Sequence, residues 1–390
     1  MRKLLAALFK EKQVAGTAVV ASSALDEDDY IVFSLDEPPF HLVTPGAVTH
    51  FSGWVLNVGR RVVTGVGVDC AGERLLAAPV SAGSALLGNV LPHVRNAASC
   101  GFGFDLRLDP HADHYDFKLL FEDGRHSDFF RYDLARVRRE SAHLARMRQE
   151  LERLAMPDGR LIAMTQGHEN VLAYRNSIIP FVWNVASYLA AAGGDVGRIR
   201  SVLDIGCGSG RALTSWHLDD PTRRLCGCDI NDELIAWGRS NLPPGVELYL
   251  NPLHPPLPFP AGEFDLVQLI SVFTHLSLPA QREWLTEIAR HVSASGYVLV
   301  TMHGRPHVRA CLPDRLAEFD AAGYIDLPHR VEGANSYVAY HARGFAKRLF
   351  AEAGFVVAGY FPGGTIAGER VIFPLAAQQD VYLLKKTGSA

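Results

Sequence analysis

The sequence predicts an α/β fold with a mostly parallel sheet, preceded by a small antiparallel β-sandwich and a helical connector. Three observations predict it. From residue 200 onward, short apolar runs alternate with helical segments, which is typical of a parallel sheet covered by helices. Residues 40–132 instead contain short β-type runs separated by turns with Gly, Asp or Pro, which favours a sandwich. Residues 135–156 are rich in Ala, Leu, Arg and Glu and lack Gly and Pro, which predicts a helix with a solvated charged face.

The chain divides into four predicted parts. They are a lead-in over residues 1–39, the β-sandwich over 40–132, the connector over 133–160 and the α/β domain over 161–390. A length of 390 residues is enough for two or more domains that each bury a core. The net charge of −4 is close to balance, so the sequence lacks the large basic field that is typical of nucleic-acid-binding proteins.

Targeting signals are weak. The apolar run Leu4–Phe9 has six residues, fewer than the roughly 7–15 of a secretory signal. A short amphipathic helix is the favoured interpretation, and a membrane-surface anchor is the alternative. No stretch approaches the ~20 apolar residues of a membrane span. The six cysteines are scattered, which favours reduced thiols, and we expect a cytoplasmic protein without a transmembrane segment.

Each predicted strand is a short apolar or alternating run that ends at a turn. In the sandwich the runs are FHLVT, HFSGWVLNV, RRVVTGVGVDC, ERLLAAPV, GFGFDLRL, YDFKLLFE and SDFFRYDL. In the α/β domain they are SVLDIG, RLCGCDI, VELYL, FDLVQLI and GYVLVTMH, with GFVVAGYF and DVYLLKK as a final pair at one edge. Helices are expected to begin near Arg211, Asn231 and Pro279. The polar stretch from Arg305 to Phe350 is expected to form a lid or a wall of the ligand site.

The stretch VLDIGCGSGR, Val202–Arg211, places three alternating glycines between a strand and a helix. Glycine permits positive φ and leaves space that a side chain would fill. Exposed N–H groups at the helix start can receive an anionic or polar group. The stretch therefore predicts a nucleotide-like ligand.

Two details of this stretch discriminate between ligands. The dinucleotide pattern GxGxxG would place its third glycine at position 211, which is Arg211, and this argues against an NAD-dependent oxidoreductase. Asp204 lies two residues before the first glycine, where a carboxylate suits a ligand with a cationic amine. S-adenosylmethionine has such a group and NAD does not. Asp229 follows Gly210 by 19 residues, close to the spacing at which an acid reaches ribose hydroxyls. This spacing favours an adenosine ligand and is equally compatible with either cofactor.

With "GCDI" after it, VLDIGCGSG resembles the first two motifs of class I S-adenosylmethionine-dependent methyltransferases, which have a Rossmann-like, mostly parallel seven-stranded sheet. The resemblance continues through PPLPFPAGEFDLVQLISVFTHLS, QREWLTEIARHVSASGYVLVTMHG and QQDVYLLKK, and covers roughly residues 160–386. These segments are similar to a bacterial branch associated with surface-glycan and glycosyltransferase systems. The resemblance implies S-adenosyl-L-methionine as the cofactor.

The resemblance also implies which residues of the glycine turn hold the cofactor. Asp204, Gly206, Gly208 and Gly210 would hold its methionine end, with Cys207 in the same turn.

The following strands would bind the rest of the cofactor. Asp229 would take the ribose hydroxyls and Ile230 would lie beside the adenine. Asn251 and Leu253 stand where the third strand meets the adenine edge; many relatives carry an acid near this point, so Asn251 is a departure. Ser271 ends the fourth strand near the expected transfer site.

Four further side chains are candidates for contact with the cofactor or the methyl acceptor. Tyr174 and Arg175 would cover the cofactor from a preceding helix, with a packing role as the alternative for Tyr174. His275 and His303 follow the fourth and fifth strands, at the edge of the sheet where open α/β folds bind ligands. Histidine titrates near neutral pH, so His275 is the first candidate for a catalytic base and His303 the second. The alternative for His275 is that it only orients its loop.

The front domain is similar to small sandwich modules found beside glycan-modifying enzymes. Trp54 is interpreted as a core residue, with a sugar-stacking platform as the alternative. The stretch DPHADHYDF is interpreted as a polar turn that enters a strand rather than as a metal site.

The sequence therefore predicts an S-adenosylmethionine-dependent methyltransferase, acting on a hydroxyl group of a sugar or glycan. The alternatives are a methyltransferase acting on a small metabolite or a protein side chain, and a non-catalytic binding protein that retains the cofactor fold. The expected partner is a small-molecule or glycan acceptor and not a nucleic acid. The sequence leaves open whether the protein forms a homo-oligomer.

Overall fold

The computed structural model describes residues 17–18, 29, 31–37, 46–59, 61–81, 94–166, 169–327, 331–334, 336–366 and 379–388. The run Leu4–Phe9 and the predicted strand FHLVT lie outside these residues. The chain forms two compact units. Unit 1 contains 1–153, 166–180 and 364–378, and unit 2 contains 154–165, 181–363 and 379–390. In the described ranges, no helix is both long enough and apolar enough to cross a membrane.

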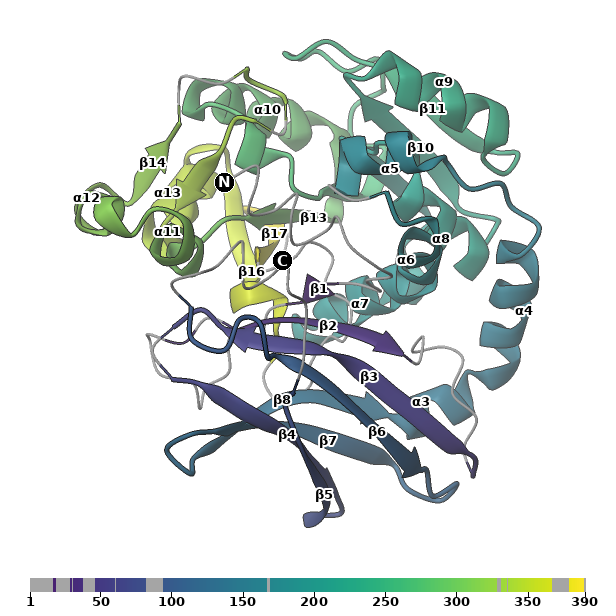
Figure 1. The fold of residues 1–390 in the computed structure, drawn as a ribbon. Helices are drawn as coiled ribbons and strands as arrows, with labels where there is room; N and C mark the ends of the chain where they lie inside the picture. The colour runs from purple at the N-terminus through teal and green to yellow at the C-terminus, as the bar shows by residue number, and fades with distance from the viewer. Residues whose placement is uncertain are drawn as a thin grey trace. The chain divides into compact units, whose positions relative to one another are not determined.

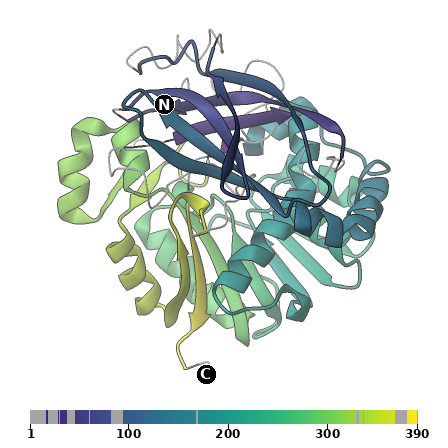
Figure 2. The same ribbon diagram turned by 90° about the horizontal axis from the view of Figure 1, so that it is seen from below.

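Unit 1 contains two four-stranded antiparallel sheets (Figure 2). The first has the order β1-β2-β3-β6, with β1 Thr17–Ala18, β2 Ile31–Glu37, β3 Val48–Asn57 and β6 Gly101–Arg107. The second has the order β5-β4-β7-β8, with β5 Glu73–Pro79, β4 Val63–Cys70, β7 His114–Phe121 and β8 His126–Asp133. Strand β2 lies within the segment interpreted as a lead-in, so the first sheet begins earlier in the chain than expected.

Aromatic side chains join the two sheets of unit 1. The ring of Phe51 on β3 lies 5.1 Å from that of Phe117 on β7, and Phe33 on β2 lies 6.1 Å from Phe130 on β8, between ring centroids. All four rings are buried. Trp54 on β3 is 7 % exposed, which supports its interpretation as a core residue.

The polar turn before β7 and the first residues of that strand carry ion pairs. Arg138 donates to Asp113 at 3.2 Å, and Arg131 on β8 donates to Asp116 at 2.6 Å. Within the described parts of the chain, no group of three or more His, Cys, Asp or Glu side chains could hold a metal ion.

The helical connector is divided in two. The sequence predicts one helix over 135–156, but the chain forms α3 Leu134–Arg139 and α4 Ser141–Leu151. Asp133 caps α3 by accepting a hydrogen bond from the N–H of Arg136, and Glu140 leaves helical geometry with φ −98° and ψ 10°. The segment contains no glycine or proline, so the break has no signal in the sequence.

Unit 2 contains a seven-stranded sheet with the order β11-β10-β9-β12-β13-β17-β16 (Figure 1). The strands are β9 Ser201–Ile205, β10 Arg224–Asp229, β11 Val246–Leu250, β12 Phe264–Leu269, β13 Val292–Met302, β16 Phe355–Phe361 and β17 Asp380–Lys386. Strands β9 to β13 are parallel, and β17 runs antiparallel between β13 and β16. All the strands predicted for this domain are present. The order of the sheet reverses at β9, and open α/β sheets bind ligands at the carboxyl ends of the strands at such a point.

Helices cover both faces of this sheet. They are α5 Gly159–Gln166, α7 Ile178–Ala191, α8 Arg211–Asp219, α9 Asp232–Asn241, α10 Leu278–His291 and α13 Arg343–Glu352. Leu203 on β9 belongs to the apolar core that includes Trp284 of α10. Asp204, the next residue, points to the opposite face. On that face its cross-strand neighbour Gln268 accepts a hydrogen bond from the indole N–H of Trp216, on α8, at 3.1 Å.

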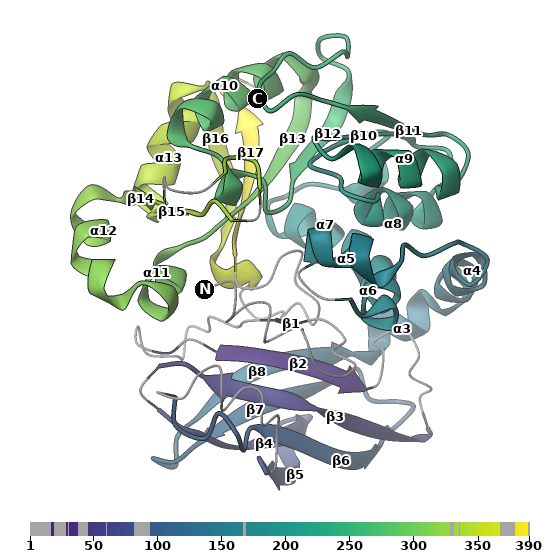
Figure 3. The same cartoon turned by 45° about the horizontal axis from the view of Figure 1, so that its top comes forward.

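The stretch after β13 is a folded insertion with its own small core. It contains α11 Arg305–Cys311, α12 Leu316–Ala322 and the antiparallel strands β14 Tyr324–Asp326 and β15 Ala339–His341 (Figure 3). Val308, Phe319, Ile325, Val338 and Tyr340 form its buried cluster.

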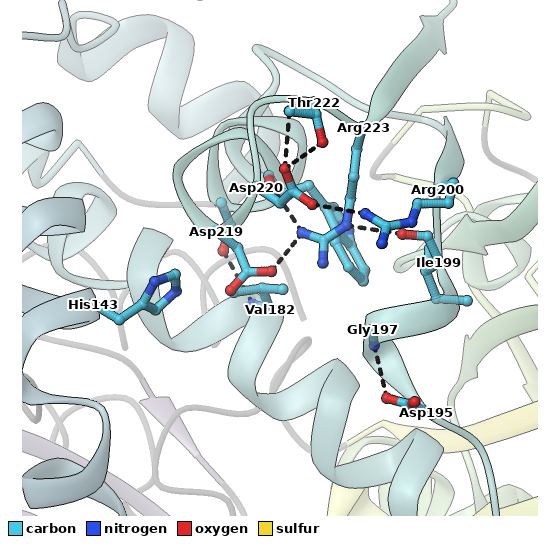
Figure 4. A network of polar contacts seen from close by, with 12 residues as sticks. His143, Val182, Asp195, Gly197, Ile199, Arg200, Asp219, Asp220, Thr222 and Arg223 are labelled. Atoms are coloured by element: carbon cyan, nitrogen blue, oxygen red, sulfur yellow. Dashed lines mark hydrogen bonds and ion pairs between the residues drawn. The ribbon is translucent and has the colours of Figure 1, made fainter.

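Directly before β10, the side chain of Arg223 makes several contacts with neighbouring elements of the protein. The buried Arg223 donates from Nε to the carbonyl oxygen of Ile199 at 3.0 Å and pairs with Asp219 of α8 (Figure 4). Its guanidinium also lies over the ring of Trp216, 5.0 Å from the centroid. These contacts anchor the end of α8 to the amino end of the sheet. The predicted ligand residues follow β9 and β10 and lie at the opposite, carboxyl end.

Candidate functional site

The glycine turn connects β9 directly to α8. Gly206, Gly208 and Gly210 have φ values of +74°, +56° and +85°. A Cβ on Gly206 would lie 2.5 Å from Cγ2 of Val272, and a Cβ on Gly208 would lie 2.7 Å from Cγ2 of Thr165. Both the left-handed backbone and the close approach of neighbouring side chains therefore require glycine here.

Three N–H groups of the turn are already bonded within the protein. Those of Gly206 and Cys207 donate to the carbonyl oxygen of Cys228 at 2.8 and 3.0 Å. That of Gly208 donates to the carboxylate of Asp229 at 2.8 Å. The protein itself therefore uses these three N–H groups. The expectation of an anionic or polar ligand concerns the N–H groups at the start of α8, and it stays a prediction. A pyrophosphate binds to free backbone N–H groups, and these three N–H groups are not free.

Asp229 ends β10 and joins the turn to α9. Its second carboxylate oxygen accepts a hydrogen bond from the N–H of Asn231 at 2.9 Å, and Asn231 in turn caps α9. Burial raises the pKa of this carboxyl, and backbone N–H groups, those of Asn231 and Gly208 first, oppose the rise. Each oxygen keeps a further lone pair, so the carboxylate can accept ribose hydroxyls as well.

Asp204 is a buried carboxyl, 3 % exposed. Burial raises its pKa to about 7, and the charge of Asp229 adds to the rise. The amide of Gln268 and the charge of Arg211 act in the opposite direction. An ammonium group beside Asp204 would lower this pKa and keep the carboxylate ionised.

The predicted adenine edge is an apolar surface. Ile230, directly after β10, is 44 % exposed. Gly333 in the insertion approaches it closely: a Cβ on Gly333 would lie 2.9 Å from Cδ1 of Ile230 and 2.7 Å from Cδ1 of Leu253. Ile230 and Leu253 are therefore brought together, as the resemblance implies.

Asn251, after β11, carries an acceptor that lacks a partner. The residue is 8 % exposed, and its N–H donates to the carbonyl oxygen of Asp229 at 3.1 Å. Its side-chain Nδ2 donates to the carbonyl oxygen of Pro252 at 2.7 Å. Its buried Oδ1 has no hydrogen-bond partner among the described residues. Such an atom suits the amino group of a ligand.

Ser271 lies in a strained turn after β12. Its φ is +63°, and strain of this kind in a residue other than glycine is concentrated at functional sites. Its N–H donates to Oγ1 of Thr301 at 2.7 Å, and its Oγ accepts a hydrogen bond from Nε2 of Gln379 at 2.8 Å. The start of β17 thus holds the turn after β12.

His275 has one ring nitrogen fixed and the other available. Nδ1 lies 2.8 Å from the carbonyl oxygen of Tyr337, so Nδ1 carries the proton. Among the described residues, Nε2 has no hydrogen-bond partner. Burial lowers the pKa of this histidine, which keeps the ring neutral. The carbonyl oxygen of His275 accepts from the N–H of Gly333 at 2.9 Å, so the insertion holds both the main chain and the ring.

His303 follows β13, in the same region as His275. Burial lowers its pKa well below the usual value, and the nearby charges of His307, His275 and His341 contribute to the shift. Its Nε2 lies 3.3 Å from Nε2 of Gln379, and its ring centroid lies 4.3 Å from that of His307.

The other three predicted cofactor residues have different positions. The thiol of Cys207 points at β10, since a Cβ on Gly227 would lie 2.9 Å from its Sγ. Tyr174 and Arg175 lie on α6 Val171–Asn176 in unit 1, where Tyr174 is 3 % exposed. Their role beside the cofactor stays a prediction.

S-adenosylmethionine fits these residues. Asp204 supplies a buried carboxylate for an ammonium group, and Asp229 has lone pairs for ribose hydroxyls. Ile230 offers an exposed apolar surface for a flat ring, and Asn251 has an acceptor without a partner among the described residues.

Three residues at this site were not identified from the sequence: Gln268, Thr301 and Gly333. Gln268 had a usable signal, because it is a polar residue within the apolar strand FDLVQLI. For Gln379, at the start of the last strand, the sequence leaves open both a structural role and a substrate contact.

Comparisons with known proteins agree with this geometry. Residues 202–296 match the family described as methyltransferase domain. The chain is 32 % identical over 106 residues to an uncharacterized methyltransferase of Synechocystis; the match covers 27 % of this chain and spans about half (48 %) of that relative.

Solved structures that the comparison finds similar to this chain include S-adenosylmethionine-dependent methyltransferases from two organisms. That of Methanosarcina mazei is 18 % identical with a TM-score of 0.36, over 48 % of this chain and 92 % of the other. A TehB-like methyltransferase from Corynebacterium glutamicum is 18 % identical with a TM-score of 0.32, and the match covers 53 % of this chain and 97 % of the other. Residues 202–296 are thus similar in sequence to a methyltransferase domain, and they contribute β9 from its second residue, strands β10 to β12 and the first residues of β13 to the mostly parallel sheet of unit 2.

Proposed function

We propose that the protein transfers a methyl group from S-adenosyl-L-methionine to a hydroxyl group of a sugar or glycan. The observation that carries the proposal is the glycine turn. Its N–H groups at Gly206, Cys207 and Gly208 are bonded internally, while the buried carboxyl of Asp204 lies beside it. This combination disfavours a pyrophosphate and suits a ligand with an ammonium group.

The chain's own residues would hold the cofactor at four points. Asp204 would pair with the ammonium group and Asp229 would accept the ribose hydroxyls. Ile230 would contact the adenine face, and Oδ1 of Asn251 would accept a hydrogen bond from the adenine amino group. When bound, the cofactor supplies a methyl group on a positively charged sulfur.

His275 would act on the methyl acceptor. Its Nε2 carries a lone pair, because Nδ1 donates to the carbonyl oxygen of Tyr337. Nε2 would take the proton of the acceptor hydroxyl as the oxygen bonds to the methyl carbon and the carbon–sulfur bond breaks. A hydroxyl needs such a base, whereas a neutral amine does not, and this supports an oxygen acceptor. The insertion that holds His275 would exclude water and orient the acceptor.

The glycan part of the proposal rests on the resemblance of residues 160–386 to the glycan-associated bacterial branch. The test is methyl transfer from radiolabelled S-adenosylmethionine to a panel of sugars, oligosaccharides, small metabolites and peptides. A base-stable methyl ether on a sugar is the expected product, absent with Asp204→Asn. Transfer to metabolites or peptides alone would replace the glycan assignment. Cofactor binding without transfer to any of these acceptors would favour a binding protein.

A further inference from the structure

The side-chain amide of Gln379 has a fixed orientation. Oγ1 of Thr301 accepts a hydrogen bond from the N–H of Ser271 at 2.7 Å and donates its own proton to Oε1 of Gln379 at 2.6 Å. Nε2 of Gln379 then donates to Oγ of Ser271 at 2.8 Å. Thr301 is fully buried and Gln379 is 4 % exposed, so water does not compete for these contacts.

This orientation decides which nitrogen of His303 carries the proton. Nε2 of His303 faces the amide nitrogen of Gln379 at 3.3 Å, and an amide nitrogen only donates. Nε2 must therefore accept, and in the neutral ring the proton is on Nδ1. Burial keeps the ring neutral, since the pKa of His303 is well below its usual value.

The Nδ1–H group of His303 makes no hydrogen bond of normal geometry within the described residues. The atom is buried, although the backbone carbonyl of Ala339 lies near the ring and acts against the lowering of its pKa. An unpaired buried donor costs about 1–3 kcal/mol, so its retention calls for an acceptor that arrives with a ligand. The His303 side chain as a whole is partly exposed and lies at the carboxyl end of β13, in the same region as His275.

We infer that Gln379 is a positioning residue that holds His303 in the Nδ1–H form, as a hydrogen-bond donor to an oxygen of the methyl acceptor. The inference rests on the proposed function and deepens it, because it assigns a different role in the same reaction to each of two histidines. His275 presents a lone pair and removes the proton, whereas His303 presents an N–H and binds the acceptor.

A second histidine–glutamine pair in the same unit has the opposite polarity. Nε2 of Gln281 donates to the carbonyl oxygens of Phe273 and Leu276 at 3.0 and 2.8 Å, which turns its Oε1 toward His341. Nε2 of His341 lies 2.9 Å from that oxygen and must carry the proton. His303 and His341 are thus expected to be opposite tautomers in one protein.

The experiment is long-range ¹H–¹⁵N NMR of the ¹⁵N-histidine-labelled, full-length, cofactor-free protein, with His303 and His341 assigned by single substitution. We expect the Nδ1–H form for His303 and the Nε2–H form for His341. The Nε2–H form for His303 would overturn the inference. Because no cofactor or acceptor is present, this result does not depend on whether the proposed function is correct.

Gln379→Glu gives the functional test. A carboxylate at this position accepts instead of donating, so it draws the proton of His303 to Nε2 and removes the Nδ1–H donor. We expect the KM for the acceptor to rise about 3–10-fold, the effect of one hydrogen bond, with kcat changed less and cofactor affinity unchanged. Gln149→Glu, the same change at an exposed position of α4, should leave both constants as they are.

An unchanged acceptor KM in folded Gln379→Glu would contradict the role in acceptor binding. If that variant does not fold, Thr301→Val removes the hydroxyl that orients the amide and should give the same rise in acceptor KM. The tautomer measured in the unsubstituted protein decides the positioning role in either case.

Discussion

The N–H of Gly208 donates a hydrogen bond to the carboxylate of Asp229 at 2.8 Å, across 21 residues of sequence. The other carboxylate oxygen accepts from Asn231, so one side chain shapes both the glycine turn and the start of α9. The turn after β9 and the acid after β10 are therefore one structural unit. A change at Asp229 should therefore alter both the ligand contact of this carboxylate and the geometry of the glycine turn.

Cofactor affinity should depend on pH through Asp204. Its pKa is about 7 in the free protein, and only the ionised carboxyl attracts an ammonium group. Affinity for S-adenosylhomocysteine should be constant above that pH and should fall below it, approaching about tenfold per pH unit. Calorimetry across this range, in buffers of different ionisation enthalpy, should detect proton release on binding. A pH-independent affinity would contradict the pairing.

The same residue should destabilise the ligand-free protein. The folded-state pKa of Asp204 lies above the ordinary value of 3.8, so stability is lost as pH rises from the lower value to about 7. Above that pH the loss is complete, and it amounts to about 1.4 kcal/mol for each pH unit that separates the two pKa values. Asp204→Asn should therefore melt higher than the unsubstituted protein in alkaline buffer, although it binds the cofactor weakly. A lower melting temperature would show that the carboxylate is stabilising.

Loss of the base should slow the reaction without affecting cofactor binding. His275→Gln removes the Nε2 lone pair, and we expect kcat to fall about 10²-fold or more. Because burial lowers the pKa of His275, kcat at saturating cofactor should be flat above its ordinary pKa and fall only at lower pH. His254→Gln, at an exposed histidine paired with Glu283, is the matched control and should keep full activity. Equal kcat values for the two variants would leave His275 a loop-orienting residue.

Asn251 should contribute to binding and not to folding. Its Oδ1 lacks a partner among the described residues, so Asn251→Ala removes an unsatisfied acceptor and should lower stability little. Cofactor affinity should fall about 3–10-fold if Oδ1 accepts from the adenine amino group. Titration with S-adenosylhomocysteine and with its analogue lacking the adenine amino group measures this contact. Asn251→Ala should bind both ligands alike, and a persistent preference for the amino form would exclude Asn251 as its acceptor.

Trp54 should matter for the stability of unit 1. It is 7 % exposed, and truncation of a buried tryptophan costs about 3–5 kcal/mol. Chemical denaturation of Trp54→Ala should show a loss of this size. A variant with unchanged stability but weaker acceptor binding would restore the interpretation as a sugar platform.

Patterns in the sequence predicted the parts of the fold that depend on local chemistry. Alternating apolar strands gave β9 to β13, and the glycine spacing placed the turn before Arg211, where α8 begins. The motif acids Asp204 and Asp229 lie beside this turn.

Tertiary contacts decided the rest. The break at Glu140 has no glycine or proline to signal it. The occupied N–H groups of the turn depend on Cys228, a residue of the neighbouring strand. The tautomers of His275 and His303 depend on Tyr337 and Gln379, which are 62 and 76 residues away in sequence.

The most direct test of the central claim is calorimetric titration with S-adenosylmethionine, S-adenosylhomocysteine and NAD. Asp229→Asn places an amide opposite the N–H groups of Gly208 and Asn231, whereas Asp232→Asn makes the same change at the neighbouring exposed carboxylate. We predict that both sulfur ligands bind and NAD does not, that Asp229→Asn weakens binding about tenfold or more, and that Asp232→Asn does not. Folded protein that binds neither sulfur ligand, or binds them equally well with Asp229→Asn, would contradict the cofactor assignment.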